Sequence, residues 1–252
     1  MELAFKLAAD PTEEPGLFRK GITICGNWVR HTMRAGIQAS GDGLVIQDNV
    51  ITDQTNKQWW INPFGVAPPV ENVTYENRAI DWSGWHILIQ GNHYEVYRHQ
   101  LGASQTKSVD GEGILIQECC GGTTINQAVI TKNVGNSYIG LYKTLHIQHV
   151  RIAHNELTAN VTNTALIFVS VDTNAQTNAM DNVVIEDNLL KGNITAIASE
   201  GGQGNVIRNN TSQSDSKIKY SCHVKVTRNT GFELQPCLGL KRALLRFGST
   251  YT

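Results

Sequence analysis

Apolar and polar positions alternate in a short phrase that recurs along most of the chain. In nearly every copy, two apolar residues occupy alternate positions, two polar or small residues follow, and an asparagine ends the phrase. Successive side chains on a strand point to opposite faces, so this alternation predicts a short strand whose first and third residues face inward. The eight copies begin at Ile22, Leu44, Ile87, Ala128, Val150, Val183, Asn205 and Val224.

The asparagines that close these phrases recur at a regular spacing. Three pairs of successive asparagines are 22 residues apart, and two other gaps are 43 and 41 residues, which we interpret as two periods each. A fixed period in this range predicts a stacked solenoid. Because asparagine tolerates left-handed backbone geometry, we expect it to form the bend that turns the chain onto its next sheet.

A repeat of this length accommodates three short strands and three bends. The sequence therefore predicts an all-β fold, a right-handed parallel β-helix in which equivalent positions stack about 4.8 Å apart. We expect an N-terminal cap segment over residues 1–20, the β-helix over 21–232, and a C-terminal cap or tail over 233–252. Short helical caps fit residues 2–9 and 240–247, although the second segment also fits a non-native tail. Insertions are expected at 53–86, 93–112 and 171–180.

Composition supports one elongated core and narrows the partners. Of the 252 residues, 40% are hydrophobic and 17% charged, which suffices for at most roughly 11 coils. The net charge of −1 gives no reason to expect nucleic acid or an anionic membrane as a partner. No apolar run approaches the roughly 20 residues of a membrane span. We expect a monomer.

The sequence alone does not establish the cellular compartment of the protein. The N-terminus lacks the charged start, apolar block and cleavage site of a secretory signal. The protein therefore stays inside the cell, has lost a signal, or is a fragment. The five cysteines form no Cys-x-x-Cys pair, and their odd number leaves at least one unpaired.

Aromatic residues and histidines gather where the rhythm is broken. Flat rings with a polar edge are good platforms for sugar faces, and loops are where such rings reach a ligand. The alternative is that these rings pack the insertions against the side of the helix. The candidate substrate-binding residues are Trp59, Trp60, Trp82, Trp85, His86, His93 and Tyr94.

On its coil repeat, the chain resembles the pectin-lyase-like superfamily of parallel β-helix proteins over about residues 20–232. Members are mostly secreted enzymes that cleave or epimerise polysaccharides, alongside viral tailspikes and adhesins. The resemblance implies a carbohydrate-binding groove along one face of the helix, a polysaccharide as partner, and a secreted or periplasmic location. We therefore expect a polysaccharide lyase or a glycoside hydrolase. The alternatives are a non-catalytic carbohydrate-binding or adhesin-like module, or a truncated inactive member.

A lyase needs a base and a cation that neutralises the uronic acid carboxylate. Lys143, next to Tyr142, follows Asn133 at a position where similar alginate and chondroitin lyases tend to carry a basic lysine. Those enzymes pair the lysine with an arginine about one coil later, and residues 164–170 contain none. Arg151 lies between two inward residues and should point outward. In the competing interpretation, which fits these departures better, Lys143 is a solvent-facing lysine on a coil.

A hydrolase needs two carboxyl groups, about 5 Å apart for retention of configuration and further apart for inversion. The best cluster is Asp110, Glu112 and Glu118, which flank a predicted strand. The adjacent Asp pair and Gly-His-Gly of polygalacturonases in the same superfamily are missing. In the competing interpretation, Asp110 and Glu112 are polar loop residues and Glu118 caps a turn.

Metal binding has weaker support. Calcium in proteins similar to pectate lyase takes several carboxylate oxygens from neighbouring coils. No segment resembles a calcium loop, and the histidines have no spacing that demands zinc. We therefore assign no cofactor firmly and keep Ca²⁺ as a possibility, with Asp42, Asp48, Asp110, Glu112 and Glu118 as candidate ligands.

Overall fold

A computed structural model of the chain contains strands and no helix among the residues that it describes. These are residues 3–7, 20–30, 32, 35–54, 78–96, 112–116, 124–144, 146–158, 165–171, 179–197 and 202–238. The all-β prediction is confirmed. In the same residues no helix is long and apolar enough to cross a membrane.

The strands form three parallel sheets that run along the axis of the molecule. The first sheet contains β1 (Leu3–Leu7), β4 (Ala35–Asp42), the first part of β7 (Arg78–Gln90), β9 (Glu112–Ile116), β12 (Ile139–Thr144), β15 (Ala165–Val171) and β18 (Asn193–Ile197). The second contains β2 (Thr23–Cys25), β5 (Val45–Gln47), the rest of β7, β10 (Thr124–Thr131), β13 (His146–Ala153), β16 (Ala179–Glu186), β19 (Val206–Arg208) and β21 (Lys225–Thr227). The third contains β3 (Trp28–Arg30), β6 (Val50–Gln54), β8 (His93–Val96), β11 (Val134–Gly135), β14 (Glu156–Thr158) and β17 (Leu189–Lys191). Two further strands, β20 (Thr211–Tyr220) and β22 (Thr230–Leu234), run from the third sheet into the first.

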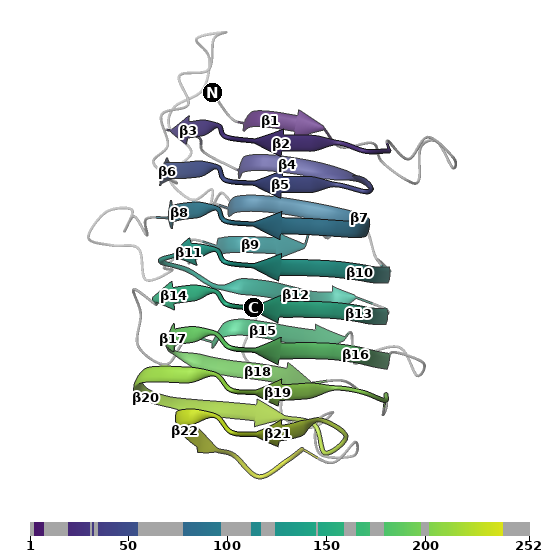
Figure 1. The fold of residues 1–252 in the computed structure, drawn as a ribbon, viewed down its shortest axis with the longest axis vertical. Helices are drawn as coiled ribbons and strands as arrows, with labels where there is room; N and C mark the ends of the chain where they lie inside the picture. The colour runs from purple at the N-terminus through teal and green to yellow at the C-terminus, as the bar shows by residue number, and fades with distance from the viewer. Residues whose placement is uncertain are drawn as a thin grey trace, which may run out of the picture.

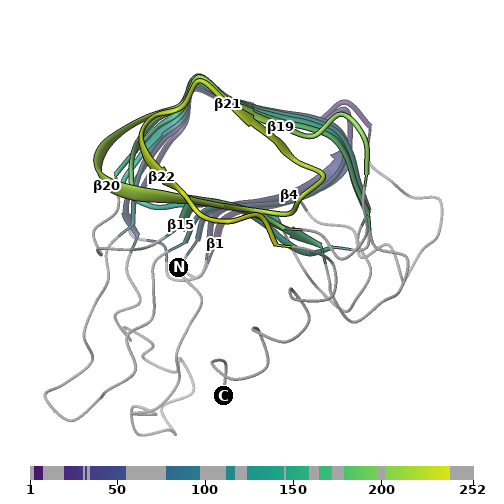
Figure 2. The same cartoon turned by 90° about the horizontal axis from the view of Figure 1, so that it is seen from below.

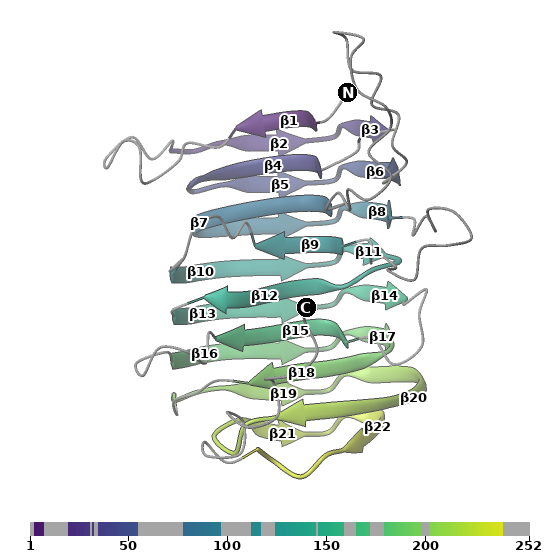
Figure 3. The same cartoon turned by 180° about the vertical axis from the view of Figure 1, so that it is seen from behind.

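The chain winds as a right-handed coil from the N-terminal to the C-terminal end. In Figure 1 the second sheet faces the viewer and its strands point to the left, whereas the first sheet lies behind and its strands point to the right. Figure 3 shows the first sheet from the other side. Viewed along the axis, each coil is a flattened ring that encloses the core (Figure 2). The fold is a parallel β-helix, as the 22-residue repeat predicts.

The inward rows of the second sheet carry the apolar residues of the repeated phrase. Val150 and Ile152 on β13 are fully buried, and so are their counterparts at alternate positions on neighbouring coils. Arg151 lies between them and is exposed, as alternation predicts. The buried side chains of all three sheets form one continuous hydrophobic core, so the predicted inward positions are confirmed.

The asparagines that close the phrases form a ladder of hydrogen bonds inside the helix. The side-chain amide of Asn155 donates to Oδ1 of Asn188 in the next coil at 2.9 Å and to the carbonyl of Ile130 in the preceding coil at 3.0 Å. Its own Oδ1 accepts the backbone and side-chain N–H groups of Asn133, both at 3.0 Å. The same pattern joins Asn27, Asn49, Asn92, Asn133, Asn155, Asn188, Asn210 and Asn229 in order.

This ladder corrects the interpretation of the longer gaps. Asn49 donates directly to Asn92 at 2.9 Å, and Asn92 donates to Asn133 at 3.0 Å, so each pair lies on adjacent coils. The gaps of 43 and 41 residues are therefore single coils that carry long insertions, and not two periods. The gap of 33 residues between Asn155 and Asn188 is likewise one coil.

The left-handed corner residue is not the asparagine but the residue before it. Positive φ angles occur at Lys132, His154 and Asp187, immediately before Asn133, Asn155 and Asn188. Glycine occupies the same corner in two coils, at Gly26 and Gly91. The prediction that the asparagine itself makes the bend is wrong, because its amide is needed inside the helix to satisfy buried backbone groups.

Both ends of the solenoid differ from the predicted boundaries. Residues 3–7 form β1, which pairs in parallel with β4, so the predicted helix over residues 2–9 is wrong. Pairing with β4 satisfies backbone groups that a helix would leave exposed at the sheet edge. At the other end the coil continues past residue 233 to Leu238, and a disulfide joins Cys222 to Cys237. Residues 240–247 lie outside the described residues.

The insertions are shorter than the sequence predicts. Residues 78–86 belong to β7, and residues 78–85 pair with β4, so the first interruption ends before residue 78 rather than at 86. Residues 93–96 form β8 and residue 112 begins β9. Regular strands therefore occupy both flanks of these interruptions, and the residues between them lie outside the described part of the chain.

We predict that Asn155→Ala lowers the free energy of unfolding by about 3 kcal/mol, because it leaves the buried Asn133 backbone N–H without its acceptor and removes the hydrogen bonds to Asn188 and to the Ile130 carbonyl. Equilibrium unfolding in urea measures the change. The matched control is Asn209→Gly, an exposed asparagine at a left-handed corner, which should cost a few tenths of a kcal/mol. Equal losses in the two variants would contradict a structural role for the ladder.

Candidate functional site

Two of the predicted sugar platforms belong to the core. Trp82 and Tyr94 are fully buried. The Tyr94 hydroxyl donates to the carbonyl of Ser137 at 2.9 Å, and burial raises the pKa of its phenol. A Cβ atom at Gly113 or Gly135 would collide with the Tyr94 ring, so these glycines form the slot that holds it. The assignment of Trp82 and Tyr94 to a substrate wall is wrong, because no ligand on the surface reaches them.

The remaining described members of that group do not form one wall. Trp85 is 39% exposed and His86 takes a left-handed corner, where its Nδ1 lies 2.6 Å from Oδ1 of Asp42. His93 is the first residue of β8 in the third sheet, and the whole second-sheet part of β7 lies between it and His86. The structure therefore brings Trp85 and His86 together at one corner and separates them from His93. Trp59 and Trp60 lie outside the described residues.

Glu112, a predicted catalytic carboxylate, lies at the start of β9 in a cluster of polar side chains. Its Oε2 lies 2.7 Å from Nε of Arg78 on β7, and its Oε1 accepts the hydroxyl proton of Tyr138 at 2.9 Å. Arg78 also contacts Asp81 on its own strand, with 3.3 Å between Nη1 and Oδ2. One guanidinium group therefore connects two carboxylates from neighbouring coils.

Asp81 lies on the outer face of the first sheet, and Arg78 contacts it from the first position of β7, in register with Glu112 at the first position of β9. Asp81 stands between Ile80 and Trp82, which fill the core, so its side chain points away from the core. Gln38, its register partner on β4, donates to Oδ2 of Asp81 at 3.1 Å. The exposed fractions of the Arg78, Asp81 and Glu112 side chains are 9%, 5% and 16%. Glu112 is thus the most exposed charged group of this cluster.

The shared guanidinium limits the separation of the two carboxylates. Since Arg78 contacts Asp81 through Nη1 and Glu112 through Nε, the contacting oxygens are at most about 8 Å apart. Carboxyl pairs in glycosidases are about 5 to 9.5 Å apart, depending on whether configuration is retained or inverted. The spacing of Asp81 and Glu112 is therefore compatible with such a pair.

The side chains of the other predicted catalytic residues lie outside the described part of the structure. Tyr142 and Lys143 lie on β12, next to β9 in the first sheet, and their side chains are outside the described part of the structure. Asp110 and Glu118 also lie outside the described residues. Of the predicted carboxylates, only Glu112 is therefore described with its partners.

The part of the chain that the structure describes contains no assembled site of the kind that the metal prediction requires. In these residues no three side chains of histidine, cysteine, aspartate or glutamate converge on a point where an ion could bind. Asp42 contacts His86, and Asp48 lies on a different corner of the coil. Of the proposed calcium ligands, the described ones thus do not meet.

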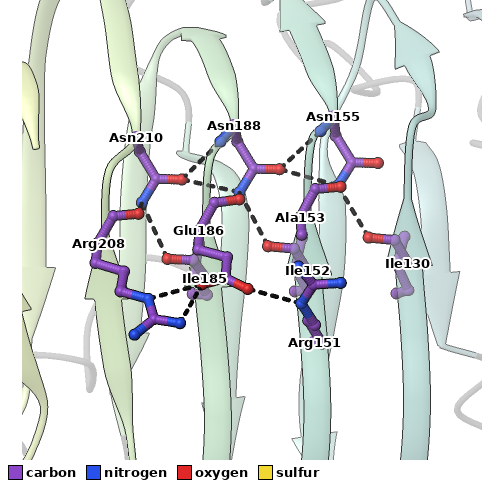
Figure 4. Close-up of polar contacts among 10 residues, drawn as sticks. All are labelled: Ile130, Arg151, Ile152, Ala153, Asn155, Ile185, Glu186, Asn188, Arg208 and Asn210. Atoms are coloured by element: carbon purple, nitrogen blue, oxygen red, sulfur yellow. Dashed lines mark hydrogen bonds and ion pairs between the residues drawn. The ribbon is translucent and has the colours of Figure 1, made fainter.

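A second polar cluster lies on the outer face of the second sheet (Figure 4). Glu186 on β16 accepts from Nε of Arg151 on β13 and from Nε of Arg208 on β19, each at 2.7 Å. The Glu186 side chain is only 7% exposed. Burial by itself raises the pKa of this carboxyl, but the hydrogen bonds and charges of the two arginines outweigh burial and hold the pKa below its ordinary value.

Comparison of the chain with protein-family models, with curated proteins and with solved structures found no match. The two polar clusters must therefore be interpreted from their own geometry.

Sequence reasoning missed Arg78, Asp81 and Tyr138. Arg78 and Glu112 are 34 residues apart, and only the pairing of β7 with β9 brings them together. A signal was present in the strand itself, because the charged residues Arg78 and Asp81 flank the apolar Ala79 and Ile80. Charged residues within a buried strand are costly unless they are paired, which makes them candidates for a polar cluster.

We predict that Arg78→Gln lowers the free energy of unfolding by about 3 to 5 kcal/mol, because it leaves two largely buried carboxylates without their counter-charge. Chemical denaturation measures the loss. As a control, Arg30→Gln on β3 removes an exposed arginine that lies 5.2 Å from the Trp28 ring, and it should cost about 1 kcal/mol or less. A loss at Arg78 no larger than at Arg30 would show that the cluster is not held by its guanidinium.

We predict a pH-dependent effect for Glu186→Gln. The pKa of Glu186 is lowered in the folded state, so its stabilising contribution is complete above the pKa of the unfolded chain and is lost as pH falls through the folded-state pKa. The variant should be less stable than the native protein by about 2 kcal/mol at pH 7, and the difference should shrink below about pH 4. Thermal unfolding across pH 3–8 measures it. A difference that stays constant over this range would contradict the mechanism, and the exposed Glu156→Gln serves as control.

Proposed function

We propose that the protein is a polysaccharide-degrading enzyme of the glycoside hydrolase type, acting on the outer face of the first sheet. The observation that carries this proposal is the pair Asp81 and Glu112, which one guanidinium holds within about 8 Å of each other. Hydrolysis of a glycosidic bond uses two such carboxyl groups, one as acid and one as base or nucleophile.

The partners of Glu112 favour its role as base or nucleophile. Arg78 and Tyr138 each direct a donor at a different carboxylate oxygen, which fixes the orientation of the Glu112 carboxylate. Glu112 is also more exposed than Asp81, so it is the carboxylate that contacts the sugar. Asp81 supplies the second carboxyl group and Tyr138 holds Glu112 in position.

Elimination has less support than hydrolysis. A lyase needs a cation that is free to neutralise the uronic acid carboxylate, and Arg78 already contacts two carboxylates of the protein. The candidate lysine, Lys143, lies on β12 of the same sheet, but its side chain is outside the described part of the structure and so adds no support for a lyase. We therefore place the lyase second among the enzyme activities.

A non-catalytic glycan-binding module is the second candidate function. It is favoured by the same ion pairs, since Arg78 occupies the space between the two carboxylates and reduces their joint negative charge. The parallel β-helix is compatible with membership of the pectin-lyase-like superfamily, which contains both enzymes and adhesins, and we propose that membership on the coil repeat. The disulfide between Cys222 and Cys237 supports a secreted or periplasmic location, because disulfides persist in oxidising compartments.

We predict that incubation with a panel of acidic and neutral polysaccharides releases new reducing ends. Glu112→Gln and Asp81→Asn should each lower kcat/KM by about 100-fold or more, because each removes a carboxyl group from proton transfer or nucleophilic attack. Glu156→Gln on the third sheet is the matched control and should retain full activity. Melting temperatures of all variants separate a loss of chemistry from a loss of folding.

Three other outcomes have distinct meanings. Ultraviolet absorbance from unsaturated uronides identifies elimination and contradicts the hydrolase. Binding without any product supports the glycan-binding module. Full activity in folded Glu112→Gln and Asp81→Asn variants would show that the catalytic site does not lie on the first sheet.

A further inference from the structure

A row of basic residues lies on the outer face of the second sheet, away from the Asp81 and Glu112 cluster. Arg151 on β13 is in register with Val184, Val206 and, one coil further, Lys225 on β21. Arg208 on β19 is in register with Glu186 on β16. Four consecutive coils thus place three cations and Glu186 on one face, and two of the cations contact Glu186.

The Glu186 carboxylate lies close to the sheet surface and holds both guanidinium groups in place through hydrogen bonds. Arg151 reaches it through Nε, and Arg208 reaches it through Nε and also through Nη2 at 2.6 Å. The arginine side chains are 45% and 49% exposed, whereas the carboxylate is almost fully buried. Among the described residues Arg151 has no other acceptor, so its two terminal nitrogens face solvent.

The cluster keeps a positive charge toward solvent. One carboxylate balances only one of two guanidinium groups, and Lys225 adds an exposed cation in the next coil. The pKa of Glu186 is lowered, so this balance holds at neutral pH. Val184 and Val206 are half-buried and present short side chains between the arginines, which lets an extended ligand lie flat on the sheet.

We propose that this face, built from Arg151, Glu186 and Arg208, binds the carboxylate or sulfate groups of an acidic polysaccharide. Guanidinium groups recognise such oxyanions through paired N–H donors, and prior fixation by Glu186 reduces the entropy lost on binding. The two arginines come from coils two steps apart, which is roughly 10 Å along the axis. Each pyranose ring of an extended glycan spans about one coil spacing, so acidic groups on alternate rings meet the two arginines.

This site does not depend on the proposed hydrolase. It lies on the second sheet, whereas the carboxylate pair lies on the first, so the binding assay and the activity assay can fail independently. If both functions hold, the second sheet binds acidic polymer while the first sheet acts on a substrate.

The test is calorimetric titration with two acidic probes, a heparin-derived hexasaccharide and a hexamer of galacturonic acid. A neutral glucose hexamer is the negative control. Arg151→Gln and Arg208→Gln should each weaken binding of an acidic probe about tenfold, and the double variant should weaken it further. Lys217→Gln on β20 removes the same charge from a half-exposed side chain and should leave the affinity unchanged.

Two further variants separate binding from folding. Glu186→Gln should lower thermal stability but leave affinity for the acidic probe no weaker than in the native protein, because the loss of fixation is offset by removal of the one negative charge between the arginines. Arg208→Lys retains the charge without the paired donors and should give intermediate affinity. Full affinity in Arg208→Lys would show attraction by net charge alone and would overturn a built site.

Three results overturn the proposal directly. They are no binding of either acidic probe, unchanged affinity in a folded Arg151→Gln/Arg208→Gln variant, and equal binding of the neutral hexamer. A single-stranded oligonucleotide that binds more tightly than the acidic glycans, with the same dependence on the arginines, would assign the face to nucleic acid and equally overturn it.

Discussion

The asparagine ladder is the interaction on which the rest of the structure depends. Each internal ladder asparagine joins its own coil to the coils on both sides, through the next asparagine and a backbone carbonyl of the preceding coil. A slip of one residue would turn every inward side chain of a strand outward, so this corner fixes the register of all three sheets. Because the ladder fixes one point per coil, the chain between two rungs varies from 19 to 43 residues. A coil of 43 residues stacks on its neighbours as well as one of 22.

Alternation was sufficient to predict the strands and the inward rows, because strand geometry is a local property. The ladder was not predictable in the same way. Asparagine was interpreted by its local preference for left-handed backbone, whereas the structure uses its amide mainly to join neighbouring coils, with some donation to the carbonyl two residues before, and leaves the left-handed corner to its neighbour. The N-terminal strand follows the same logic. Leu3, Phe5 and Leu7 alternate as in a strand, but the helix prediction ignored the free edge of β4 that decides the outcome.

The candidate site was only partly predictable, for a related reason. Glu112 was identified from the sequence, but its partner Arg78 became visible only when β7 and β9 were known to be adjacent. Burial was equally hidden. Tyr94 was expected to be a platform because it borders an insertion, yet two glycines on neighbouring strands leave a slot that fits its ring. The role of these glycines, to make room for the Tyr94 ring, depends on which residues are neighbours in the stack of coils, and the sequence alone does not show those neighbours.

The two polar clusters show how a stack of coils creates opposite chemistry from the same residue types. On the first sheet one guanidinium is shared by two carboxylates, which leaves a formal negative charge in a largely buried place. On the second sheet one carboxylate is shared by two guanidinium groups, which leaves a positive charge on half-exposed side chains. Two carboxyl groups held close together are what hydrolysis of a glycosidic bond requires. Excess positive charge at a wet surface favours capture of anions without a proton transfer. The sign of the unbalanced charge and its burial therefore distinguish the two clusters, and they are the basis on which we propose catalysis at the first sheet and anion binding at the second.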